Sequence, residues 1–143
     1  QPRSRGLGDV YKRQVQARDL MRRTGASTLV VTISVDPRTG EEYRKDFCDP
    51  SPHWKVICLV PDPYTTRGEA ATLRDLAARH HWSDAVVLTD PPHVTRTRMW
   101  MDRCAAIPVT VVESTDRASR HVNLRKVAYQ SAGWVVGQVQ SCP

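Results

Sequence analysis

The sequence predicts an α/β fold in which helices cover a parallel, doubly wound sheet. The chain of 143 residues holds four apolar, β-branched runs of strand length, and helix-periodic segments lie between most of them. Strands that alternate with helices are typical of parallel sheets, because each crossover places a helix on a sheet face. The runs are continuous rather than alternating, which indicates strands buried on both faces.

The first half of the chain predicts one helix, two strands and a long loop. Residues 15–26 form a short helix that ends at Gly25, a usual helix stop. Residues 27–35 (STLVVTISV) and 54–60 (WKVICLV) are continuous strand runs. Between them, residues 36–53 are rich in Pro, Gly and charge, so we expect a loop with at most two helical turns near 40–47.

The second half predicts three helices and two strands. Residues 65–82 place Ala70, Leu73, Leu76 and Ala77 on one helical face. We expect strands over 84–89 and 107–114, with a helix over 91–104 between them. A closing helix over 120–139 is weakened by two glycines in its interior.

The N-terminal segment SRGLGDVYKRQ, residues 4–14, has no apolar period. It resembles the end of a transposase-type sequencing-library adapter translated in frame. We therefore expect residues 1–14 not to be native, and residues 15–143 to form one domain that is incomplete at its N-terminus. We leave residues 1–14 out of the functional interpretation on that ground.

Charge gives little support for a nucleic-acid partner. The chain has 21 Lys and Arg against 15 Asp and Glu, a formal net charge of +6. Residues 1–14 hold four of the bases and one of the acids, which leaves 17 against 14, or +3, for the predicted domain. With so small an excess we expect no nucleic-acid binding.

Two strand-to-helix junctions carry the candidate functional residues. At the first, Thr66 and Glu69 have the spacing of a capping box, in which hydroxyl and carboxylate each bond a free backbone N–H. At the second, Asp90 is placed to cap a helix that Pro91 opens. Parallel sheets bind ligands beyond the carboxyl ends of their strands, where helix N-termini favour anions.

These junctions predict an anion pocket. His93 and Arg96 are three residues apart and therefore share a helical face, with Arg96 suited to clamp a phosphate or carboxylate. His93 is a candidate acid or base, with Asp90 as a second candidate. The other expected ligand-binding residues are Thr65, Thr66, Arg67, Glu69 and Thr89. The competing interpretation is that all of these residues only cap and brace helices.

The two junctions together resemble the YdcF/SanA/ElyC-like family, the domain of unknown function 218. PYTTRGEA (63–70) stands where the family has an N-T-x-E-N-A-like motif, and Thr66 and Ala70 match it. VVLTDPPHVTRTR (86–98) matches the second motif, V-T-S-x-x-H-x-x-R-A, at Thr89, His93 and Arg96. The TRGEA variant resembles the actinobacterial branch.

The resemblance implies a Rossmann-like, three-layer parallel sheet that lacks its first strand. In the family that strand and a glycine-rich turn lie just before the position of Val15, and the strand is central, between the strands near 29–35 and 84–89. The Ser-Gly-Gly turn expected after the next strand is absent, since VTISVDP stands there.

The resemblance also implies a function in the bacterial cell envelope, with the domain on the extracytoplasmic face of the membrane and an N-terminal anchor upstream. The implied ligand is a small anionic molecule that bears phosphate or resembles a nucleoside, such as S-adenosylmethionine. A non-catalytic envelope assembly factor is the alternative function, and the cytoplasm is the alternative location.

The four cysteines, Cys48, Cys58, Cys104 and Cys142, allow three disulfide connectivities. We expect the pairs Cys48–Cys58 and Cys104–Cys142, which would staple the long loop and the C-terminal tail and indicate an oxidising compartment. Four reduced thiols in a cytosolic protein are the alternative. No C-x-x-C pair exists, so we expect no zinc or other metal site.

Overall fold

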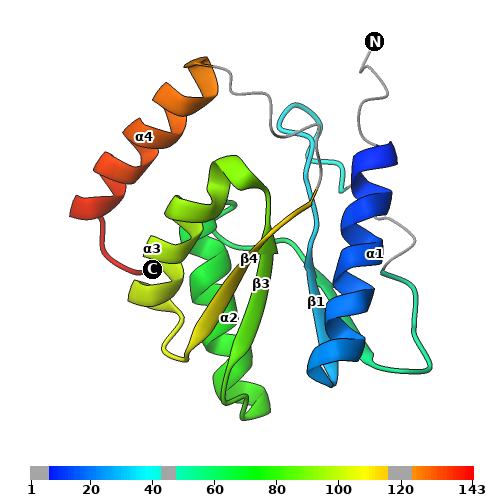
Figure 1. The fold of residues 1–143 in the computed structure, drawn as a ribbon. Coiled ribbons are helices and arrows are strands. Elements are labelled where there is room, and N and C mark those ends of the chain that lie inside the picture. The colour runs from blue at the N-terminus through cyan, green and yellow to red at the C-terminus, as the bar shows by residue number, and fades with distance from the viewer. Residues whose placement is uncertain (1–6, 43–47, 116–123) are drawn as a thin grey trace.

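The structure, a computed structural model, describes residues 7–42, 48–115 and 124–143. Figure 1 shows its strands in the middle of the molecule and its helices around them. In chain order the elements are α1 (Leu7–Thr24), β1 (Thr28–Thr32), β2 (Lys55–Leu59), α2 (Thr66–His80), β3 (Ala85–Thr89), the 3₁₀ turn η2 (Pro91–His93), α3 (Val94–Cys104), β4 (Val109–Glu113) and α4 (Leu124–Val139).

The predicted α/β class is confirmed, but the strands form two small sheets rather than one continuous sheet. β1 pairs with β2 and β3 pairs with β4, both in parallel. In Figure 1, β1 lies between α1 and β3, and no ladder joins β1 to β3 among the described residues. The three-layer Rossmann-like sheet of the sequence prediction is therefore not confirmed.

Both outer edges of each two-stranded sheet lack a strand partner in the described part of the chain, and the edges of β1 and β3 illustrate this. Ile33 N–H donates to the Leu59 carbonyl at 2.8 Å, and Lys55 N–H donates to the Ser27 carbonyl at 2.9 Å. In a parallel ladder alternate residues face one neighbour, so the backbone groups of Thr28, Val30 and Thr32 face away from β2. In the other sheet, Ala85 N–H donates to the Pro108 carbonyl and Ser114 N–H donates to the Thr89 carbonyl. By the same alternation, the backbone groups of Val86 and Leu88 face away from β4.

Helix boundaries follow the sequence prediction closely except at the two ends of the chain. α1 begins at Leu7, eight residues before the predicted start at Val15, and ends in a turn at Gly25, whose φ is 68°. The predicted helix over 91–104 begins as the 3₁₀ turn η2 and continues as α3. The helical turns expected near 40–47 and the first residues of the closing helix fall largely outside the described residues.

The hydrophobic core lies between α2, α3 and the β3–β4 sheet. It consists of Ala70, Trp100, Met101, Cys104 and Ala105, each at most 3 % exposed. Side chains from all four of these elements surround it: Leu73, Val87, Met99 and Val109. Around β1 and β2 the fully buried apolar side chains are fewer, namely Met21 and Ile33.

The two predicted disulfides are confirmed. Cys48–Cys58 ties the end of the long loop to β2, with the Cα atoms 5.7 Å apart. Cys104–Cys142 ties the C-terminal tail to the end of α3, with the Cα atoms 5.6 Å apart. Each covalent link removes conformational freedom from the unfolded chain, so both stabilise the fold.

Candidate functional site

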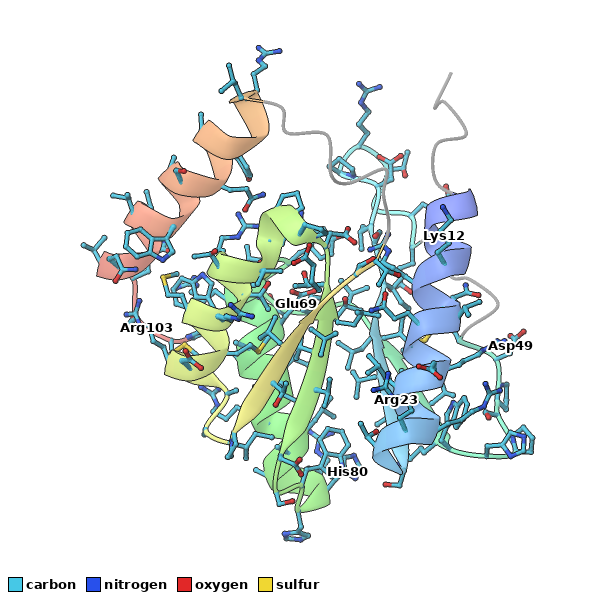
Figure 2. The ribbon with its side chains drawn as sticks, viewed as in Figure 1. Lys12, Arg23, Asp49, Glu69, His80 and Arg103 are labelled. Carbon is cyan, nitrogen blue, oxygen red and sulfur yellow. A yellow bond between two sulfur atoms is a disulfide. The ribbon has the colours of Figure 1, made fainter. Side chains whose placement is uncertain are left out.

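A partly buried polar cluster lies where β1, α2, η2, α3 and α4 come together. Its members are Thr32, Glu69, His93, Arg96 and Gln130, and we call it the polar cluster. Glu69 is in the first turn of α2 and is hydrogen-bonded to the Thr32 side chain at the end of β1. Figure 2 shows Glu69 in the interior, whereas Lys12, Arg23 and Asp49 lie at the periphery.

His93 connects α3 to α4 through one ring nitrogen. Its Nδ1 lies 3.2 Å from Arg96 Nη2 and 3.1 Å from Gln130 Nε2. A guanidinium nitrogen can only donate, so His93 Nδ1 is the acceptor of the Arg96 contact and carries no proton in this arrangement. The predicted proximity of His93 and Arg96 on one helical face is thus confirmed.

Arg96 has a donor that no protein group satisfies. Its Nε is buried and has no hydrogen-bond partner in the described part of the molecule. Gln130 Oε1 is likewise buried and has no hydrogen-bond partner among the described residues. α4 comes so close that a Cβ on Gly133 would lie 3.1 Å from Arg96 Nη1. A guanidinium whose buried Nε–H has no partner can offer a charge-assisted hydrogen bond to an oxygen anion.

Glu69 is the acidic member of the polar cluster. Burial raises the pKa of its carboxyl above the ordinary value of 4.5, and this exceeds the lowering by the Thr32 hydrogen bond and by the Arg96 charge. In its protonated form the carboxyl no longer neutralises Arg96. The charge available to an external anion therefore depends on the protonation of Glu69.

The capping box predicted for α2 from Thr66 and Glu69 does not form. Thr65, not Thr66, is the N-cap, and its hydroxyl accepts from Gly68 N–H at 3.1 Å. Glu69 N–H bonds the Thr65 carbonyl, while the Glu69 carboxyl turns inward to Thr32. With Thr65 as N-cap, the N3 position is held by Gly68, so Glu69 is one residue too far along to complete a capping box.

The prediction that the Asp90 side chain caps the second helix is wrong. Asp90 holds the N-cap position of η2, but its side chain makes no capping bond and accepts instead from Arg13 Nη1 at 3.2 Å. Its backbone carbonyl accepts from His93 N–H at 2.8 Å. Thr89 ends β3, and its carbonyl accepts from Ser114 N–H.

Arg67 lies apart from the polar cluster. Its Nη1 donates to the carbonyl of Ser141 at 3.1 Å, on the side of α2 that faces the C-terminal tail. Of the predicted ligand-binding residues, Glu69, His93 and Arg96 are therefore brought together. Thr65 caps α2, and Thr66 follows it half-buried.

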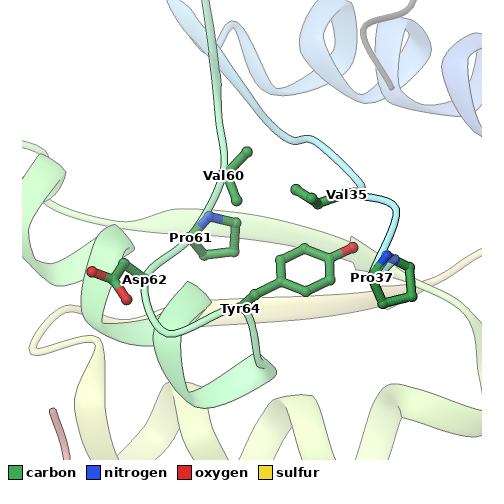
Figure 3. A pocket seen from close by; sticks show the side chains of 6 residues that line it. All are labelled: Val35, Pro37, Val60, Pro61, Asp62 and Tyr64. Carbon is green, nitrogen blue, oxygen red and sulfur yellow. The ribbon is translucent and has the colours of Figure 1, made fainter. Parts of the chain in front are cut away.

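A separate apolar hollow of about 440 Å³ lies beyond the carboxyl ends of β1 and β2. Figure 3 shows the Tyr64 ring between two prolines at its rim. Its lining residues are Val35, Pro37, Val60, Pro61, Asp62 and Tyr64. Its lining holds one carboxylate and no basic side chain, so it is poorly suited to an anion.

The structure adds three side chains that the sequence interpretation did not select. Thr32 and Gln130 belong to the polar cluster, and Arg13 holds Asp90. Thr32 could have been found from its place at the carboxyl end of a predicted strand. No sequence pattern marks Gln130, because its contact with His93 depends on how α4 packs on α3. Arg13 was not considered because it lies within residues 1–14, which the sequence interpretation leaves out.

Neither a metal site nor a membrane span is found within residues 7–42, 48–115 and 124–143. No group of three or more His, Cys, Asp or Glu side chains there could hold a metal ion. No helix in the same ranges is long and apolar enough to cross a membrane. Comparison with protein-family models, with curated proteins and with solved structures finds no match to this chain.

Proposed function

We propose that this chain is a YdcF-like bacterial cell-envelope domain that binds an anionic, phosphate-bearing or nucleoside-type small molecule at the carboxyl ends of its strands. The proposal rests on one observation, the buried Arg96 Nε that has no acceptor in the described part of the chain. A buried unsatisfied donor costs about 1–3 kcal/mol, which an anionic oxygen would recover.

In this proposal the residues of the polar cluster have distinct tasks. Arg96 binds the anion, and His93, half-buried beside it, donates or accepts a proton at the bound molecule. Glu69 competes with the anion for Arg96 when it is ionised and ceases to compete when it is protonated. The anion is therefore bound more tightly at lower pH, as long as its own charge persists.

The proposed location is the extracytoplasmic face of the membrane. Both disulfides favour an oxidising compartment, because cytosolic thiols are kept reduced. Attachment to the membrane through an upstream anchor rests on the family resemblance alone. A reduced, cytoplasmic form of the protein is the alternative.

A second candidate function is a non-catalytic envelope assembly factor. His93 bridges α3 and α4 through Arg96 and Gln130, which is what bracing residues do. In that case the polar cluster holds the C-terminal helix in place for contact with other proteins. Removal of His93 or Arg96 would then destabilise the fold without changing any ligand affinity.

Calorimetric titration distinguishes the two functions. The probes are inorganic phosphate, adenosine diphosphate and S-adenosylmethionine, each added to the unsubstituted chain and to Arg96→Ala and His93→Ala. Loss of a charge-assisted hydrogen bond costs about 1.5–3 kcal/mol, so Arg96→Ala should weaken binding of a ligand about 10- to 100-fold.

Arg98→Ala is the matched control, because Arg98 is exposed on the same helix. It removes the same charge from α3 and should leave the affinity within about twofold, since an exposed charge acts weakly over distance. Absence of binding by all three probes, together with a lowered unfolding midpoint for Arg96→Ala and His93→Ala, would instead support the assembly factor.

A further inference from the structure

The C-terminal helix α4 covers the polar cluster on one side. Gln130 reaches His93 from this helix, and Gly133, one turn on, lies against Arg96. Gly137, the next residue on the same stripe, is buried against Met99 and Trp100 of α3. Small residues at positions 133 and 137 let the α4 backbone approach α3 closely, and Gln130 then lies over the ring of His93.

Only one face of α4 is held by the rest of the molecule. Its main contacts run to α3 and η2, while most of its other described side chains are exposed. Val135 is 60 % exposed and Val139 is 85 % exposed. A helix with so little buried apolar area has a low free energy of local opening. The contacts of α4 with α3 and η2 alone are therefore too few to hold the helix firmly against the polar cluster.

What fixes α4 is its C-terminal end. Cys142, three residues past the helix, is disulfide-bonded to Cys104 at the end of α3. The neighbouring Arg103 donates from Nη1 to the Gly137 carbonyl and from Nη2 to the Gln140 carbonyl, at 2.7 Å for the latter. These bonds satisfy carbonyls at the helix C-terminus that have no intrahelical partner.

The tail beyond the disulfide is held by α2. Arg67 donates to the Ser141 carbonyl and Arg74 donates to the Pro143 carbonyl, both at 3.1 Å. Both contacts are exposed, so each contributes little on its own. The disulfide is the one covalent element among these attachments, and it raises the effective concentration of the tail at α3.

We propose that α4 is a cover over the polar cluster and that the Cys104–Cys142 disulfide is the clamp that holds it closed. Reduction by a dithiol breaks the S–S bond and gives two thiols, with two electrons and two protons supplied by the dithiol, which becomes a disulfide itself. α4 is then held by its narrow contact stripe and by exposed arginine bonds alone. Its opening exposes His93 and Arg96.

The inference that α4 covers the polar cluster stands without the proposed function. The effect of the cover on anion binding rests on the proposed function. With the clamp open, Gln130 no longer occupies His93 Nδ1, and a small anion reaches Arg96 without displacing the helix. The protein would thus bind its anion more tightly after reduction. The second disulfide, Cys48–Cys58, lies at β2 and should have no part in this.

The test measures access to His93 directly. Diethyl pyrocarbonate acylates unprotonated imidazole, and peptide mass spectrometry reports the rate at each histidine. The proteins are the unsubstituted chain, the pair Cys104→Ser with Cys142→Ser, the control pair Cys48→Ser with Cys58→Ser, and Gln130→Ala. His53 and His81, both exposed, are internal references for the reactivity of the reagent, and the circular dichroism of each variant shows whether it remains folded.

We expect the rate at His93 to rise about tenfold without the Cys104–Cys142 bond and severalfold in Gln130→Ala, because each removes a restraint on opening. The control pair should leave the rate unchanged. Equal rates at His93 in all four proteins would overturn the clamp. So would an equal rise in both cysteine pairs, since that indicates general loosening.

Phosphate titration of the same proteins separates this inference from the proposed function. A higher rate at His93 accompanied by tighter phosphate binding supports both. A higher rate with no phosphate binding in any variant confirms the cover and contradicts anion binding. An unchanged rate with phosphate binding that Arg96→Ala abolishes confirms the anion site and overturns the cover.

Discussion

The molecule contains two halves whose strands are similar in sequence and different in environment. One half consists of β3, β4, α2 and α3, and the other of α1, β1 and β2. TLVVT in β1 and AVVLT in β3 are equally apolar and β-branched. Yet the buried core is built almost wholly in the half that contains β3.

The difference teaches that the fully buried core depends on the helices of each half rather than on its strands. β3 and β4 pack against α2 and α3, where Trp100 and Met101 are each 3 % exposed. The strands themselves differ little, because β1 and β3 each have four half-buried residues and one exposed residue. Hydrophobic stabilisation follows the area removed from water, so the two halves should contribute unequally to stability.

The largest expected effect sharpens this comparison. Trp100→Ala removes the largest side chain of the core and should lower the free energy of unfolding by about 3–5 kcal/mol. Val30→Ala in half-buried β1 should cost about 1 kcal/mol. Urea denaturation followed by circular dichroism measures both. Equal losses would show that the two halves are equally well packed and contradict the comparison.

An intermediate effect is expected at the connection between the halves. The loop from β2 to α2 passes so close to Gly68 that a Cβ there would overlap the Pro63 carbonyl oxygen. Gly68→Ala should therefore lower the unfolding free energy by about 1–3 kcal/mol, because the obstacle is backbone.

Gly133→Ala is the control for that substitution. Its Cβ would meet the end of the flexible Arg96 side chain at 3.1 Å, and alanine favours a helix over glycine by about 1 kcal/mol. Thermal melts of the two variants should move in opposite directions or, at the least, differ by several degrees. A Gly68→Ala protein as stable as the parent would disprove the close approach.

The smallest effect concerns Glu69, which links α2 in one half to Thr32 in the other. Its raised pKa means that the folded protein binds a proton more readily than the unfolded chain. The stability from this proton is complete below pH 4.5 and is lost as the pH rises through the folded pKa. Urea midpoints between about pH 4 and about pH 8 measure this loss.

Glu69→Gln should flatten that pH dependence, because glutamine stays neutral and keeps a similar shape. Glu113→Gln is the matched control, since Glu113 is an exposed glutamate at the end of β4 and its replacement should keep the parental slope. A Glu69→Gln protein with the parental slope would show that another group is responsible.

Local sequence signals predicted the elements and the disulfides well. The four strands, the helix over α2 and the contact of His93 with Arg96 follow from periodicity and spacing. The cysteine pairing was predicted because it staples the long loop to the strand that follows it and the C-terminal tail to the end of a helix.

The rest depends on contacts between distant segments. The Glu69 side chain bonds Thr32, 37 positions earlier in the chain, and takes no part in capping α2. Likewise the Asp90 side chain binds Arg13 of α1 instead of its own helix. The division into two sheets also could not be read from the strand runs, because it depends on which edges meet.

The open strand edges have a consequence for the protein in concentrated solution. The backbone groups of Thr28, Val30, Thr32, Val86 and Leu88 face no strand in the described part of the chain, and an edge of this kind can pair with another copy. The formal net charge of +6 keeps copies apart at low ionic strength. Added salt screens that repulsion, so self-association should increase with salt as well as with protein concentration.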